Sequence, residues 1–244
     1  MTSYFEHIHT LFGCASCFWC DQAALNVNSC CRHPSGHMRD AADENKCGNH
    51  NFGGDVVLTE MDDSWRMQLA RKFAAWAHGD QKYGEKPYVV HLEAVAWKLA
   101  AHNDDPDMII AAWLHDVLED TEVTAETIES IFGFMVLRIV RAVTNEPGKN
   151  RKEKTEKTLP KIRSVGGAAL QLKLCDRIAN VRACIDGTGK SLLKMYVKER
   201  ELFEQLLGRE DGHYPELWKE LDESYEEAII EAKRQKELKN GSAR

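Results

Sequence analysis

The chain has 244 residues, of which 43% are hydrophobic and 29% are charged, a balance typical of a globular protein with one substantial core. Its formal net charge of -7 at pH 7 argues against a broad nucleic-acid surface but is compatible with a small anionic substrate. No apolar run approaches the roughly 18 residues of a membrane span, so neither an extended nucleic acid nor a membrane is expected as a partner. The N-terminus lacks a basic region followed by an apolar segment and a small-residue cleavage site, so we expect a cytoplasmic protein.

Residues 1–55 differ in composition from the remainder of the chain. They are rich in Gly, Asn, Cys and His and show no sustained hydrophobic period, which predicts an irregular extension. The cysteines and histidines could hold a structural zinc ion, although their order follows no standard zinc-binding spacing. A disordered extension, or residues foreign to the native functional protein, are the alternatives. The six cysteines of this segment are Cys14, Cys17, Cys20, Cys30, Cys31 and Cys47.

Helical signals follow one another from residue 56 onward. Residues 63–79 place apolar side chains on one face at three-and-four spacing, as in an amphipathic helix. Asp105 followed by Pro106 is a cap with proline at the first helical position, and it opens a further helix. The expected helices cover residues 63–79, 89–101, 107–120, a short stretch between Thr124 and Gly133, 134–143, 167–184, 190–207 and 215–238.

The remaining segments complete the predicted organisation. Residues 146–160 are polar and rich in lysine, which we interpret as a connection between helices. No stretch alternates convincingly with period two, so the fold class is expected to be all-α. The predicted domains are an irregular Cys/His-rich extension of unknown role (1–55), a helical domain (56–232) and a charged tail (233–244).

The sequence AAWLHDVLEDT gathers four titratable side chains directly after an apolar run. On one continuous helix His115 stacks over Glu119, and Asp116 over Asp120, because residues four apart share a face. Such groups beside a core are costly unless they are compensated, and a divalent cation is the common compensation. The alternative is a helix end that simply emerges into solvent.

Two further residues favour the metal interpretation. His91 lies in the first helical turn after a proline, about two dozen residues upstream of the His115–Asp116 pair. Asp176 lies on a later amphipathic helix, within the sequence LKLCDRIANVR. An ordered series of His, then His-Asp, then a distant Asp on another helix resembles the metal site of the HD superfamily.

Within that superfamily, the segments HDVLEDT and KLCDRIANVR resemble the RelA/SpoT hydrolase domain and its small single-domain alarmone hydrolase relatives. The resemblance covers roughly residues 62–207. It implies an all-α HD-domain helical bundle that hydrolyses the 3′-pyrophosphate of (p)ppGpp or (p)ppApp with a metal ion. No synthetase portion follows, so hydrolysis alone is expected.

The resemblance also implies a role for each matching residue. Glu119 and Asp120 match the family's acidic pair, which acts on the water nucleophile and in proton transfer. The family generally uses Mn²⁺, although imidazole and carboxylate ligands also suit Zn²⁺ or Fe²⁺. Four residues match the metal ligands: His91, His115, Asp116 and Asp176.

Three further residues are candidates for substrate contacts. Lys82 lies in AHGDQKYGEKPYVVH, which is similar to a family segment, and would contact a phosphate. Asn180 matches a residue that contacts the nucleotide, and a polar residue on a helix surface is the alternative. Lys161 belongs to a lysine-rich segment that either meets phosphates or is simply solvated. Leu92 stands where the family often has Pro, a departure that we expect to alter a turn rather than the neighbouring ligand.

Two other functions remain open from the sequence. One is an HD phosphohydrolase that acts on another nucleotide, for example as an NADPH phosphatase or a nucleotidase. The other is a degenerate HD module that binds a nucleotide or a protein without catalysis, which the intact set of candidate ligands disfavours. A small nucleotide is the expected partner, and a homodimer is a further candidate.

Overall fold

The computed structural model describes residues 31–32, 38–39, 63–188 and 192–241. The chain divides into two compact units, Met1–Met61 and Asp62–Arg244. In the first unit, β1 (Cys31–Arg32) pairs antiparallel with β2 (Met38–Arg39). The other expectations for residues 1–55, including the zinc alternative, lie outside the described residues.

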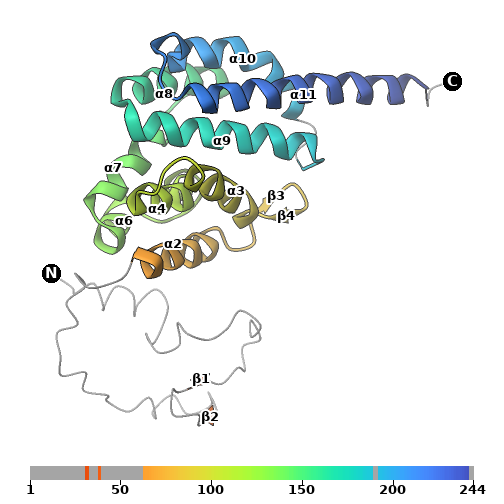
Figure 1. Cartoon of the computed structure of the whole chain (residues 1–244). Coiled ribbons are helices and arrows are strands. Elements are labelled where there is room, and N and C mark those ends of the chain that lie inside the picture. Colours follow the sequence, from red (N-terminus) through yellow and green to blue (C-terminus); the bar gives the residue numbers. More distant parts are fainter. Residues whose placement is uncertain (1–30, 33–37, 40–62, 189–191, 242–244) are drawn as a thin grey trace. The chain divides into compact units, whose positions relative to one another are not determined.

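The second unit is a helical bundle, and the all-α prediction is confirmed for its described residues (Figure 1). Among those residues, the unit has one small β-hairpin, in which the two-residue strands β3 (Lys82–Tyr83) and β4 (Lys86–Pro87) pair antiparallel. None of the described helices is both long and apolar enough to cross a membrane. The helices are α2 (Asp63–His78), α3 (Val89–Ala100), α4 (Pro106–Leu114), α5 (Val117–Asp120), α6 (Ala125–Phe132), α7 (Phe134–Val143), α8 (Arg151–Val165), α9 (Gly167–Ile185), α10 (Leu193–Leu207) and α11 (Pro215–Gly241).

Helix α9 lies at the centre of this bundle, with α3 and α4 on one side and α11 on the other (Figure 1). Its side chains are buried around most of its circumference, as expected for a helix with neighbours on several sides. Cys175 and Cys184 are both buried on it. A polar residue on α9 is therefore held inside the bundle by the neighbouring helices.

A buried arginine joins α9 to α10. The guanidinium of Arg177 lies 4.2 Å from the ring centre of Phe203 and 4.7 Å from that of Tyr196, both on α10. Its Nη1 lies 3.5 Å from Oε2 of Glu199, also on α10, and the arginine side chain is only 6% exposed. The aromatic faces and the carboxylate together compensate for the loss of water around the guanidinium.

The prediction of a polar connection over residues 146–160 is wrong, because helix α8 begins at Arg151 and occupies most of that segment. Asn150 caps this helix, since its side-chain oxygen accepts a 3.0 Å hydrogen bond from the backbone N–H of Glu153. Lys157 then pairs with Glu153 one turn away, at 2.7 Å. The high polarity of this segment does not exclude a helix, because Lys and Glu are good helix formers. A capping residue together with paired charges suits an exposed helix.

The predicted continuous helix over residues 107–120 is also wrong. Helix α4 ends at Leu114, residues 115–116 form a turn, and α5 adds one more helical turn. The cause lies in His115, whose Nδ1 donates a 2.8 Å hydrogen bond to the carbonyl oxygen of Ala112 and satisfies an acceptor at the helix end. The four titratable residues therefore do not share one helix face.

Two arginines share one aspartate between the C-terminal helices. Asp222 on α11 accepts hydrogen bonds from Arg200 on α10 at 2.8 Å and from Arg209, in the 3-10 turn η5 (Arg209–Asp211), at 2.7 Å. The hydrogen bond from Arg209 is the main reason why the pKa of the Asp222 carboxyl lies below its ordinary value of 3.8. This carboxylate is therefore more stable as an anion in the folded chain than in the unfolded chain.

We expect the stabilising effect of Asp222 to depend on pH. A depressed pKa contributes stability that is present above the unfolded pKa and is lost as the pH falls through the lower folded pKa. Asp222→Asn should lower Tm by about 2–4 °C at neutral pH, the shift that ~1 kcal/mol causes in a domain of this size. The difference should shrink below about pH 4.

Thermal unfolding followed by circular dichroism from neutral to acidic pH measures this difference. Glu223→Gln is the matched control, because Glu223 is an exposed carboxylate on the same helix. A Tm difference for Asp222→Asn that stays constant down to pH 3 would contradict the assignment of the effect to the charge.

Candidate functional site

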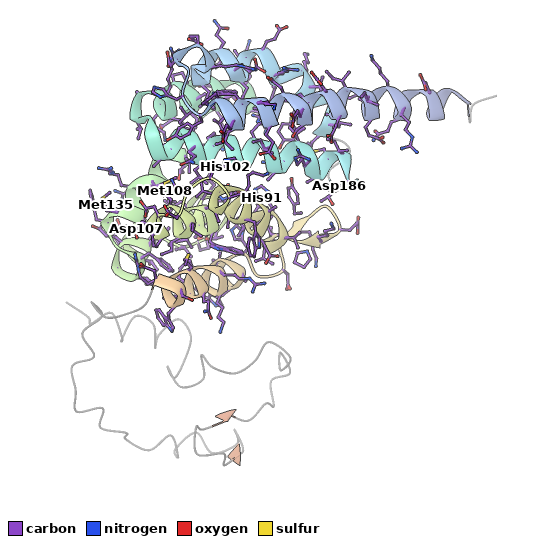
Figure 2. All side chains as sticks on the ribbon, in the orientation of Figure 1. His91, His102, Asp107, Met108, Met135 and Asp186 are labelled. Carbon is purple, nitrogen blue, oxygen red and sulfur yellow. The ribbon has the colours of Figure 1, made fainter. Side chains whose placement is uncertain are left out.

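Three helices bring the candidate metal ligands together. His91 lies in the first turn of α3, where this helix packs against α9 (Figure 2). His115 and Asp116 occupy the turn that follows the buried apolar run of α4. Asp176 lies near the middle of α9 and is 7% exposed. The ligands thus come from three separate places in the fold, α3, the turn after α4, and α9.

The ligand atoms of these four residues converge. Nε2 of His91 lies 3.5 Å from Oδ2 of Asp116 and 3.4 Å from Oδ1 of Asp176. Nε2 of His115 lies 3.1 Å and 3.8 Å from the same two oxygens. One atom from each of His91, His115 and Asp116 falls within 4.8 Å of the others, a spacing suited to a common metal ion.

The hydrogen-bonding state of His115 fits a metal ligand. Its Nδ1 donates to the carbonyl of Ala112, which leaves the Nε2 lone pair facing the cluster. That Nε2 is buried and makes no hydrogen bond to the described residues, although Oδ2 of Asp116 lies 3.1 Å from it. Two imidazole Nε2 atoms facing the oxygens of two carboxylates suit a shared divalent cation.

The electrostatics of the cluster also favour a cation. Burial by itself lowers the pKa of His91, but the carboxylates of Asp116 and Asp176 outweigh it and raise that pKa to about 9. Burial acts against ionisation of both carboxyls as well, yet the neighbouring histidines, together with Lys173 in the case of Asp176, hold their pKa values below the usual range. The two carboxylates are therefore anionic and attract positive charge to this buried point.

Neighbouring side chains fix the orientation of both ligand carboxylates. The hydroxyl of Tyr88 donates a 2.7 Å hydrogen bond to Oδ2 of Asp116. Nζ of Lys173 lies 2.8 Å from Oδ2 of Asp176, while Asn180 donates to the other oxygen, Oδ1. These contacts surround the ligands with donors that hold them in place.

Glu119 and Asp120 lie at the accessible edge of the cluster, on α5. Both oxygens of Glu119 accept hydrogen bonds from Asn145, one of them at 2.7 Å from its backbone N–H. Although solvent reaches Glu119, the protein around it and the charge of Asp116 raise the pKa of its carboxyl. Oδ2 of Asp120 accepts a 3.1 Å hydrogen bond from Nε2 of Gln81.

The three candidate substrate residues have different surroundings. Asn180 lies beside the cluster, where its Oδ1 accepts a 2.8 Å hydrogen bond from the hydroxyl of Tyr83. Lys82 is exposed on β3. Successive residues of a strand face opposite sides, and Tyr83 faces the cluster, so Lys82 faces away from it. Lys161 donates to the carbonyl oxygen of Thr144 at 2.7 Å, just after α7, and is therefore engaged within the fold.

Sequence reasoning did not single out four residues that donate hydrogen bonds to the predicted carboxylates. Lys173 had a local signal, because it precedes Asp176 by three residues on one helix and such pairs meet. The others act across elements, and no local pattern predicts those contacts. They are Gln81, Tyr88 and Asn145.

Sequence comparison finds curated proteins that are similar to this chain. The guanosine-3′,5′-bis(diphosphate) 3′-pyrophosphohydrolase of Aquifex aeolicus (strain VF5) is 41% identical over 121 residues, which cover 48% of this chain and 17% of that protein. The guanosine-3′,5′-bis(diphosphate) 3′-pyrophosphohydrolase MESH1 of Danio rerio is 35% identical over 115 residues, which cover 45% of this chain and 64% of that protein. The chain thus spans less than two thirds of the length of these curated relatives.

A solved structure and a family match extend the comparison. The structure, described as a metazoan ortholog of SpoT that hydrolyses ppGpp, superposes with a TM-score of 0.58 at 26% identity. The superposition covers 66% of this chain and 94% of that one. Residues 67–211, more than half of the 244, match the HD domain family. The chain therefore belongs to the HD domain family, as the resemblance of its motifs predicts.

Proposed function

We propose that this protein is a metal-dependent phosphohydrolase that removes pyrophosphate from the 3′ position of alarmone nucleotides, (p)ppGpp or (p)ppApp. The observation that carries the proposal is the buried convergence of two histidines and two aspartates with an acidic pair at its open edge. The names of the similar proteins point to this substrate class within the HD domain family.

The four converging residues would hold the ion in this proposal: His91, His115, Asp116 and Asp176. A bound divalent ion supplies Lewis-acid chemistry, since it acidifies water and polarises a phosphoryl oxygen. We propose Mn²⁺ as the ion, because hard carboxylates and borderline imidazoles in one set suit it. Zn²⁺ and Fe²⁺ are the alternatives.

The acidic pair would handle protons during hydrolysis. Water adds to the phosphorus bonded to the ribose 3′ oxygen, the bond between that phosphorus and the 3′ oxygen breaks, and pyrophosphate leaves. Glu119 accepts the proton of the water, for which a raised pKa is favourable, and the two N–H groups of Asn145 keep it in position. Asp120 is the second carboxylate through which a proton reaches the departing 3′ oxygen.

Substrate binding would use the donors beside the cluster. Asn180 lies next to Asp176 and would contact the nucleotide, while Lys82 and Lys161 are the weaker candidates for phosphate. The homodimer and the cytoplasmic location also stay proposals that rest on the sequence.

Removal of a ligand should abolish both metal binding and turnover. We expect about one divalent ion per chain, and we expect Asp176→Ala to lose it together with hydrolysis, because Asp176 contributes one of four converging ligands. Metal content after dialysis, measured by plasma mass spectrometry, checks this directly. Asp186→Ala is the matched control, since Asp186 is exposed at the C-terminal end of the same helix (Figure 2). Full metal content in Asp176→Ala would overturn the ligand assignment.

Changing the charge of Glu119 should separate catalysis from metal binding. Glu119→Gln keeps the shape but removes the carboxylate that accepts a proton, so kcat should fall by ~10²-fold or more while the metal is retained. Steady-state kinetics and metal content together measure this. Glu129→Gln, at an exposed position on α6, is the control. Turnover near that of the unmutated protein would leave Glu119 with a structural role only.

A substrate panel tests the reaction class. The manganese-loaded protein, incubated with ppGpp, ppApp, NADPH and simple nucleotides, should release pyrophosphate from the 3′ position of an alarmone. Product identification by chromatography and mass spectrometry distinguishes the outcomes. Release of inorganic phosphate from NADPH alone would favour the other HD phosphohydrolase function. No product from any of them, with metal bound, would favour a binding module.

A further inference from the structure

The loop between α2 and α3 is anchored at both ends by aromatic rings. His78 is the last residue of α2, Tyr88 immediately precedes α3, and their rings stack at a centroid distance of 4.4 Å with an interplanar angle of 17°. The backbone N–H of Gln81 donates to the carbonyl of His78 at 2.9 Å, and the N–H of Tyr88 donates to the carbonyl of Gln81 at 3.0 Å. Gln81 is thus fixed by the backbone at the point where the loop closes.

The side chain of Gln81 connects His78 to Asp120. Its Nε2 lies 3.1 Å from Oδ2 of Asp120, and its Oε1 lies 2.8 Å from Nδ1 of His78. A carboxylate can only accept, so the amide nitrogen must face Asp120 and the amide oxygen must face the histidine. That oxygen in turn requires a proton on Nδ1 of His78.

The other ring nitrogen of His78 is consistent with this order. Within the part of the chain that the structure describes, Nε2 is buried without a hydrogen-bond partner, and the residue is 6% exposed. A proton on Nε2 would be a buried donor without an acceptor, which is unfavourable. The chain of hydrogen bonds therefore has one direction, from His78 Nδ1 through the Gln81 amide to Asp120.

We propose that Gln81 and His78 are positioning residues that aim the carboxylate of Asp120 for the reaction. This inference rests on the proposed function, because it takes Asp120 as one of the two catalytic carboxylates. Asp120 ends a four-residue helix and is exposed, so its side chain needs an external donor to hold one orientation. Catalytic groups must be held close to the productive geometry, and supporting donors of this kind commonly supply that restraint.

The same ring pair also reaches a metal ligand. Tyr88, stacked on His78, donates its hydroxyl hydrogen bond to Asp116. The loop therefore orients one carboxylate of the metal cluster through Tyr88 and one carboxylate of the acidic pair through Gln81. The two functions are separable, because Gln81 has a hydrogen bond to Asp120 but none to the four candidate ligands among the described contacts.

Kinetics of substituted proteins test the positioning role. Gln81→Leu should lower kcat about 10-fold or more, with KM and metal content nearly unchanged, and His78→Leu should lower kcat at least as much. His78→Asn should keep most of the activity, because an asparagine amide nitrogen can occupy the place of Nδ1 and donate to Gln81. In an Asp120→Asn background, Gln81→Leu should cost little more, since the two residues act as one unit. Gln68→Leu, on the exposed face of α2, is the control.

A spectroscopic readout keeps this proposal separate from the proposed function. The ¹⁵N resonances of His78, identified by their loss in His78→Asn, should report a protonated Nδ1 and a bare Nε2. In Gln81→Leu that preference should disappear. A proton on Nε2 in the unmutated protein, or full activity in Gln81→Leu, would overturn the positioning role. Absence of hydrolysis by the unmutated protein would contradict the proposed function and with it the catalytic part of the positioning role, whereas a wrong tautomer with hydrolysis intact would contradict the positioning role alone.

Discussion

The burial of two carboxylates against two imidazoles is the constraint on which the rest of the domain depends. Asp116 and Asp176 lose most of their water inside the bundle, and a desolvated anion is unfavourable unless positive charge and donors replace that water. His91 and His115 supply part of the compensation, and Lys173 supplies more for Asp176. A divalent cation would complete it. The packing of α3, α4 and α9 therefore holds the carboxylates of Asp116 and Asp176 close together despite their mutual repulsion.

The interrupted helix is the local solution to this constraint. Helix α4 ends at Leu114, Nδ1 of His115 donates a hydrogen bond to the carbonyl of Ala112 at this helix end, and residues 115–116 form the turn that carries two of the ligands. The short α5 then places the acidic pair beside, rather than within, the buried cluster. The largely buried ligand Asp116 and the solvent-exposed carboxylates of Glu119 and Asp120 are thus separated by about one helical turn.

Much of the fold could be predicted from the sequence, because amphipathic periods, caps and glycines act locally. Asp105 caps α4 through the backbone N–H of Asp107, and Gly133 separates α6 from α7 at a φ of 92°, as their sequence signals indicate. The convergence of His91, His115, Asp116 and Asp176 was expected from family resemblance, and spacing alone could not have given it. The two errors were of different kinds, a helix missed in a polar segment and a helix predicted through residues 115–116 where the chain turns. Helix α8 and the contacts of Gln81, Tyr88 and Asn145 depend on elements far away in sequence.

The position of Arg177 has a consequence for where this domain can end. This arginine directly follows a candidate ligand, and its guanidinium lies against Tyr196 and Phe203 of α10. In a chain cut after α9, the guanidinium of Arg177 would lose the aromatic rings of α10. This loss would occur next to Asp176, whose carboxylate must stay in place to bind the ion. The smallest autonomous unit must therefore retain α10, and the family match does extend beyond it, to residue 211. Recombination between such domains would preserve the cluster only at junctions that keep α9 and α10 from the same parent.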